Sequence, residues 1–157
     1  MTSRALAELY RDHGHAVLRR ARRLLKNDDD ARDVLQDVFL ELFRNPQRFE
    51  ARSSIATYLF AATTHACLNR IRDAKNRTRL VAIEHAGRSQ LAPARGETRA
   101  LATEIIAGLS EDDAALAVYL YCDELTHDEI AELFGWSRRH VGDVAKRLRL
   151  RIMERVA

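Results

Sequence analysis

The sequence predicts an all-α protein of two small helical domains joined by a flexible linker, with a helix-turn-helix in the second domain. Apolar residues recur at helical spacing over most of the chain, while Gly and Pro number only 6 and 2 among 157 residues. Over residues 78–96 this periodicity fades and the composition becomes polar and basic, as in a linker. We therefore expect one domain over residues 1–77 and the other over residues 97–157.

Three amphipathic helices are predicted in the first domain. Carboxylates in the turn at residues 27–30 can cap the second helix and favour its positive N-terminal end. Asn45-Pro46 ends that helix, because the residue before Pro is pushed out of the α conformation. Ser54 is placed to cap the third helix. The predicted spans are residues 3–25, about 30–44 and about 55–76.

The second domain is predicted to begin with a helix near residues 97–107. Ser110 caps a further helix that runs to about residue 122, with Tyr121 expected on its buried side. Cys67 and Cys122 stand alone, without a CxxC motif or a histidine cluster. We expect both to be reduced, buried, small hydrophobic residues.

Residues 126–152 have the pattern of a helix-turn-helix. Thr126 and Glu129 form a capping box, Gly135 supplies the positive φ of the turn, and Ser137 caps the second helix. Apolar residues at helical spacing give that helix an inner side at Val141, Val144 and Leu148. Its outer side is mostly basic and carries Arg138, Arg139, His140, Asp143, Lys146, Arg147, Arg149 and Arg151. The pattern indicates a DNA-reading helix, although a helical hairpin with a solvated basic face would share it.

Charge is segregated along the chain. The net charge is only +3, but residues 97–135 hold ten Asp and Glu against one Arg, whereas residues 136–157 hold seven Lys and Arg against two acidic residues. Such segregation is typical of a protein that contacts nucleic acid with some surfaces and avoids it with others.

Several function classes lack support in the sequence. There is no phosphate-binding loop, no nucleophile paired with a base and no metal-ligand spacing, so we expect neither an enzyme nor a cofactor or metal site. Arg4 and Glu8 interrupt any apolar run that could serve as a signal peptide, and the longest apolar stretch, residues 55–68, is too short for a bilayer. We therefore expect a cytoplasmic protein without membrane insertion.

Two runs of sequence resemble bacterial RNA polymerase sigma factors. The run DARDVLQDVFLELFRNPQRFEARSSIATYLFAATTHACLNRIRDAKNR is similar to sigma region 2, and GLSEDDAALAVYLYCDELTHDEIAELFGWSRRHVGDVAKRLRLRI is similar to region 4. Two such domains with a short linker are the layout of the extracytoplasmic-function (ECF) group. A helix of the form DxxQDxFLxxF before a Phe-containing loop is the most specific piece, since a generic regulator has no reason to carry it.

The resemblance implies a polymerase-docking face on the second helix. By itself, the pattern of this face favours a solvated helix surface, and the match to the family on both sides of it favours docking instead. In the family it contacts the clamp helices of the polymerase β′ subunit. The implied docking residues are Asp33, Gln36, Asp37, Leu40 and Glu41.

The resemblance also implies that the loop at residues 48–54 and the helix over 55–72 open the −10 promoter element and capture an unstacked base. Tyr58 stands where ECF sigma factors usually carry Trp. For Tyr58 and Phe60 a purely structural role in the core is equally open. The implied −10 residues are Arg48, Phe49, Arg52, Ser53, Ser54, Tyr58, His65, Arg70 and Arg72.

The second helix of the helix-turn-helix matches the element that reads the −35 sequence. Ala61, His65, Gly142 and Val144 depart from the residues usual in the family, which leaves the promoter sequence open. Close approach of the backbone to DNA would explain Gly142. The implied −35 residues are Ser137, Arg138, Arg139, His140, Asp143, Lys146, Arg147 and Arg149.

The partners implied by the family are core RNA polymerase, through its β′ clamp helices and β flap, promoter DNA and an anti-sigma factor. Two alternatives remain. One is a stand-alone regulator that binds DNA without polymerase, against which the docking residues argue. The other is a protein-binding adaptor that has lost DNA binding, against which the basic helix argues.

Overall fold

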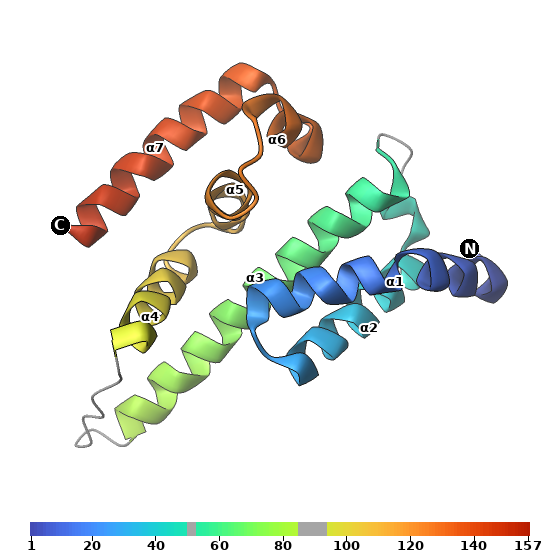
Figure 1. Cartoon of the computed structure of the whole chain (residues 1–157), viewed down its shortest axis with the longest axis horizontal. Coiled ribbons are helices and arrows are strands. Elements are labelled where there is room, and N and C mark those ends of the chain that lie inside the picture. The colour runs from blue at the N-terminus through green and yellow to red at the C-terminus, as the bar shows by residue number, and fades with distance from the viewer. Residues whose placement is uncertain (50–52, 85–93) are drawn as a thin grey trace. The chain divides into compact units, whose positions relative to one another are not determined.

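The computed structural model describes residues 1–49, 53–84 and 94–157, and short turns connect its helices in these ranges. No strand occurs in these ranges, and the predicted all-α class is confirmed. Figure 1 shows the order of the helices along the chain. They are α1 (Ser3–Leu25), α2 (Asp28–Arg44), the 3-10 helix η1 (Pro46–Arg48), α3 (Ile55–Glu84), α4 (Ala94–Ala107), α5 (Glu111–Tyr121), α6 (His127–Phe134) and α7 (Arg138–Val156).

The chain divides into two compact units. The N-terminal unit comprises Met1–Cys67 together with Ala131–Trp136, and the C-terminal unit comprises Leu68–Ile130 together with Ser137–Ala157. The first part of α3 therefore belongs to the N-terminal unit and its remainder to the C-terminal unit. The predicted domain limits, 1–77 and 97–157, stay a prediction.

In the N-terminal unit, α1 and α2 lie side by side (Figure 1). Tyr10 of α1 meets Phe39 of α2 edge to face, with ring centroids 5.0 Å apart. The cap of α2 differs from the prediction: the Asn27 side chain accepts from the amide of Asp30, so the helix begins at Asp28 and the three aspartates fill its first turn. The core of this unit contains Val17, Ala21, Leu25, Val34, Val38, Phe39, Leu42, Leu59 and Cys67.

A buried arginine joins α1 to α3. Arg20 is only 8% exposed, and its Nε and Nη2 donate to Oγ1 of Thr64 at 2.9 and 2.8 Å. Its guanidinium lies 3.6 Å from the ring centroid of Phe60. Burying a charged group is costly unless hydrogen bonds compensate, and these contacts supply them. The apolar periodicity of α1 does not predict this burial.

In the C-terminal unit, helix α3 continues to Glu84 and α4 begins at Ala94, so helices occupy part of the segment expected to be linker. The last described side chains of α3, including Leu80 and Val81, are exposed. The apolar pattern therefore fades before the helix ends, because a solvated helix needs no apolar face. The predicted linker residues 85–93 lie outside the described residues.

Helix α5 is buried along most of its length, and α7 lies against it. Ser110 caps α5 as predicted, its hydroxyl accepting from the amide of Asp113. Tyr119 is buried, whereas Tyr121, expected inside, is 57% exposed because two further residues turn it to another face of the helix. Cys122 is the C-cap and is exposed. The prediction of a buried thiol was correct for Cys67 and wrong for Cys122.

Candidate nucleic-acid interface

Helix α7 presents one apolar and one basic side. Val141, Val144 and Leu148 are buried, and the Ser137 hydroxyl accepts from the amide of His140 at 3.1 Å, which caps the helix as predicted. All eight residues assigned to the −35 site are exposed. Their side chains are therefore accessible along one continuous helix of Arg138–Val156. Arg151, in contrast, donates from Nη1 to Oδ2 of Asp113 at 3.0 Å and contacts α5.

Helix α6, which precedes α7, has a defined hydrogen-bonded motif at each of its two ends. The Thr126 amide and hydroxyl donate to the Glu129 carboxylate at 2.7 and 2.9 Å, and the Glu129 amide donates back to the Thr126 hydroxyl. These bonds, the backbone one first, lower the pKa of Glu129 below its ordinary value. At the other end of α6, Gly135 has a φ of +67°, and the Trp136 amide donates to the Ala131 carbonyl at 3.0 Å, as in a Schellman motif. The capping box and the positive φ of Gly135 were predicted from the sequence, and the Schellman hydrogen bond was not.

The surroundings of Arg138 and Gly142 on α7 bear on base reading. Arg138 pairs with Asp128 of α6, with Nε and Oδ1 3.5 Å apart and both side chains largely exposed. A pair this exposed contributes little, so it can yield to a nucleic-acid contact. A Cβ added at Gly142 would lie 3.8 Å from Nδ1 of His127, an ordinary contact distance. Packing within the protein therefore does not require a glycine at this position.

The outer face of α2 is polar and accessible. Asp33, Gln36 and Asp37 are exposed, and Leu40 is 43% exposed, while the opposite side of the helix forms core. Phe43, near the C-terminal end of the same helix, is 38% exposed. The exposed apolar side chains of Leu40 and Phe43, on the same helix as exposed carboxylates, make this surface suited to binding a protein.

Glu41 has a different environment from the other residues assigned to docking. Its Oε1 accepts from Nδ2 of Asn45 at 3.0 Å and lies 2.9 Å from Nη1 of Arg48 in η1. The structure therefore joins a residue assigned to polymerase to one assigned to the −10 element. No pattern in the sequence links the two residues.

Phe49 and Tyr58 form the aromatic part of the −10 candidate site. Their rings meet edge to face with centroids 5.5 Å apart. Partial burial raises the pKa of the Tyr58 hydroxyl, the charge of Glu41 raises it further, and Arg48 opposes the shift. Ser53 and Ser54 are exposed, and the Ser54 hydroxyl accepts from the amide of Thr57 at 3.1 Å, as predicted for a cap. Arg52 lies outside the described residues.

The remaining residues assigned to the −10 element are less accessible. His65 and Arg70 are half-buried. Arg72 donates from Nη2 to the carbonyl of Leu109 at 2.9 Å, within the C-terminal unit. Arg72 was predicted to contact the −10 DNA, and this hydrogen bond occupies one of its guanidinium nitrogens within the protein. Phe60 lies under the guanidinium of Arg20, which favours a structural role for that ring.

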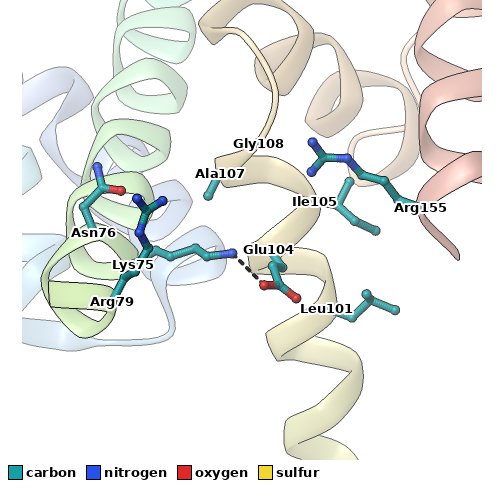
Figure 2. A pocket seen from close by; sticks show the side chains of 9 residues that line it. All are labelled: Lys75, Asn76, Arg79, Leu101, Glu104, Ile105, Ala107, Gly108 and Arg155. Atoms are coloured by element: carbon teal, nitrogen blue, oxygen red, sulfur yellow. Dashed lines mark ion pairs between the residues drawn. The ribbon is translucent and has the colours of Figure 1, made fainter. Parts of the chain in front are cut away.

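A cavity of about 410 Å³ lies within the C-terminal unit (Figure 2). Lys75 of α3 and Glu104 of α4 form an ion pair at its wall, with Nζ and Oε1 3.1 Å apart. The guanidinium of Arg155 lies so close to Gly108 that an added Cβ there would collide with it. The lining combines these groups with aliphatic side chains and holds no pairing of a nucleophile with a base.

The described parts of the chain contain no group of three or more His, Cys, Asp or Glu residues placed to hold a metal ion. None of their helices is both long enough and apolar enough to cross a bilayer.

Comparison with known proteins links this chain to transcription. The family model described as sigma-70 region 2 matches residues 9–77, which include α2, η1 and Tyr58. RNA polymerase sigma factor YlaC of Bacillus subtilis is 26% identical over 156 residues, which cover 94% of this chain and 90% of that protein. ECF RNA polymerase sigma factor SigM of Mycobacterium tuberculosis is 34% identical over 71 residues, covering 45% of this chain and 36% of SigM.

One solved structure is similar over nearly the whole chain. It is the sigma factor RpoE of Bartonella quintana, crystallised with the anti-sigma factor NepR. The TM-score is 0.50 at 17% sequence identity, and the match covers 96% of this chain and 95% of that one. At this identity the likeness shows the fold alone.

Proposed function

We propose a separate role for each of the candidate binding surfaces of this chain. The chain is an RNA polymerase sigma factor of the ECF group and binds RNA polymerase. The region that matches sigma-70 region 2 docks on core polymerase and opens the −10 element, and α7 reads the −35 element. The polymerase supplies the chemistry, the chain itself needs no cofactor, and it acts in the cytoplasm with the polymerase. The observation that carries the proposal is the joint presence of a sigma region 2 sequence and a capped basic recognition helix in one chain.

Docking on the β′ clamp helices is proposed for the outer face of α2. The face offers the carboxylates of Asp33 and Asp37, the amide of Gln36 and the exposed side chain of Leu40. The opposite side of α2 is core, so this face is available without unfolding the helix. Two carboxylates followed along the helix by an exposed leucine suit a basic, partly apolar protein surface.

Reading of the −35 element is proposed for α7 in the major groove. Arg138, Arg139 and His140 occupy its first turn, from which side chains reach base edges in helix-turn-helix proteins. Lys146, Arg147 and Arg149 lie further along and are suited to phosphates, which position the helix. Ser137 and Asp143 are exposed as well. The last turns of α7 expose Leu150, Met153 and Val156, which supports docking of this end on the β flap.

Opening of the −10 element is proposed for the residues around η1 and the start of α3. Extruding a base costs a few kcal/mol, so a site must hold the base once it has left the stack. The edge-to-face pair of Phe49 and Tyr58 provides aromatic surface for stacking, and Arg48 is placed for a phosphate. Ser53 and Ser54, which are exposed, and the half-buried His65 are proposed to extend this surface. The roles of Arg52, Arg70 and Arg72 stay predictions from the family resemblance.

Regulation is proposed to come from an anti-sigma partner. A similar fold, RpoE of Bartonella quintana, was crystallised with such a protein. An anti-sigma factor that covers the α2 face or α7 would block core docking or DNA reading without altering the fold.

The test of the proposed function is in vitro transcription with core polymerase on a promoter library. We expect transcripts only when the chain is present, from promoters that share one −35 and one −10 sequence. Core alone and core with the Asp33→Arg, Asp37→Arg variant are the controls. The same background transcription in all reactions would refute the proposal.

The stand-alone regulator makes the opposite prediction about DNA affinity. Residues 97–135 hold ten acidic residues next to the basic α7, and they lower the potential that the helix presents to DNA. We expect the chain alone to bind promoter duplex poorly at about 0.15 M salt, and core to raise affinity by holding two weak contacts together. Nanomolar, sequence-specific binding by the chain alone would favour the stand-alone regulator.

A further inference from the structure

Glu41 differs from the docking residues that precede it on α2. Its carboxylate is directed past the end of the helix, where Oε1 accepts from Nδ2 of Asn45 at 3.0 Å and lies 2.9 Å from Nη1 of Arg48. Asn45 is the C-cap of α2, and Arg48 is the last residue of η1. A single carboxylate oxygen therefore fastens both the helix end and the following turn.

The turn that Glu41 fastens leads directly to the aromatic pair. The Arg48 amide donates to the Asn45 carbonyl at 3.0 Å and the Phe49 amide donates to the Pro46 carbonyl at 3.1 Å, which makes this segment tight. Phe49 is the next residue, and its ring meets Tyr58 of α3 edge to face. Besides partial burial, the charges of Glu41 and Arg48 both act on the pKa of the Tyr58 hydroxyl, the first raising it and the second lowering it. Glu41, Arg48 and Tyr58 therefore interact electrostatically.

We infer that Glu41 is a positioning residue for the −10 step, which holds Arg48 and Phe49 in place for the extruded base, and that it does not serve polymerase docking. The inference rests on the proposed function. A site that captures an extruded base works best when its parts are ordered beforehand, because ordering them during opening would add to the barrier. The Glu41 contact uses Nη1, and a guanidinium has further N–H donors for a phosphate.

The experiment measures two properties of the holoenzyme separately: affinity for core, and the rate of promoter opening at saturating core. Opening is followed by the fluorescence of 2-aminopurine in the non-template strand of the −10 element. For Glu41→Ala we expect core affinity within about twofold of wild type and opening slowed roughly 2- to 5-fold, the range of an exposed ion pair. Glu41→Gln keeps an oxygen that can accept from Asn45, so it should lose less.

Two comparisons separate positioning from a general loss of structure. The double variant Glu41→Arg, Arg48→Glu restores the ion pair with reversed polarity and should open promoters faster than Arg48→Glu alone. Glu8→Gln removes an exposed ion pair of the same type on α1, with Arg4, and should change neither property. Circular dichroism checks that each variant keeps its helices.

Three results would overturn the inference. One is a Glu41→Ala variant that loses core affinity but opens promoters normally once bound. Another is unchanged opening in Glu41→Ala, and the third is a double variant no faster than Arg48→Glu. Failure of the wild-type chain to bind core would instead refute the proposed function, and the inference with it.

Discussion

The two candidate interfaces of this protein are built in different ways. The −35 candidate site lies on one helix, where a single cap at Ser137 and a buried stripe orient every proposed contact residue. The −10 candidate site is assembled from the end of α2, η1 and the start of α3, through Glu41–Arg48 and Phe49–Tyr58 contacts. A site on one helix should tolerate side-chain changes one at a time, whereas an assembled site depends on contacts between elements.

The largest expected effect is on core binding, through the outer face of α2. The double reversal Asp33→Arg, Asp37→Arg should weaken core affinity by about 4 kcal/mol or more, roughly 1000-fold, because like charges would face each other in the interface. Helicity should be retained, since both side chains are exposed. Titration with labelled core measures the affinity. Binding equal to that of the wild-type chain would remove docking from this face.

Next in size is the buried contact that supports the assembled site. Arg20→Ala should lower the free energy of unfolding of the N-terminal unit by about 2–4 kcal/mol, because it removes two hydrogen bonds to Thr64 and the contact with Phe60 and leaves a cavity. Arg19→Ala, at the exposed neighbouring position, is the matched control and should have almost no effect. Urea denaturation followed by circular dichroism distinguishes the two. Equal stability of the two variants would show that the Arg20 contacts contribute nothing net.

A smaller effect is expected on the single-helix site, residue by residue. Arg138→Ala should cost the holoenzyme about 1–3 kcal/mol on its preferred promoter and relax the preference at one −35 base pair. Lys146→Ala should weaken all −35 sequences alike and lower the salt dependence of binding. A promoter library read by sequencing gives both results. An unaltered base preference in the Arg138 variant would exclude direct reading by this residue.

The smallest effect concerns the capping box that begins α6. The folded-state pKa of Glu129 is below its ordinary value of 4.5. The stabilisation by its carboxylate is thus present above pH 4.5 and is lost as the pH falls through the folded pKa. Thermal melting from neutral to acidic pH should show a smaller decline for Glu129→Gln than for wild type. Parallel declines in the two proteins would show that the cap is not coupled to stability.

The elements predicted well are those whose signals act within one or two helical turns. The capping box at Thr126, the left-handed turn at Gly135 and the caps at Ser110, Ser137 and Ser54 were all predicted and are present. The same holds for the exposed residues of α7 and of the α2 face. The length of α3 was predicted wrongly: the helix was expected to end at about residue 76 and ends at Glu84. A solvated helix can continue after its apolar pattern has faded.

The sequence by itself determined the helical class, the two capped helices α6 and α7 with their turn, and the residues exposed on α7. Periodicity and capping depend on neighbours along the chain, which the sequence lists in order. Only the tertiary structure decided that Arg20 is buried against Phe60 and Thr64, that Arg72 contacts Leu109, and that Glu41 binds Arg48 of η1. These pairings depend on which helix faces meet and where a turn returns, and a charged side chain looks the same in the sequence whether it meets water or a partner.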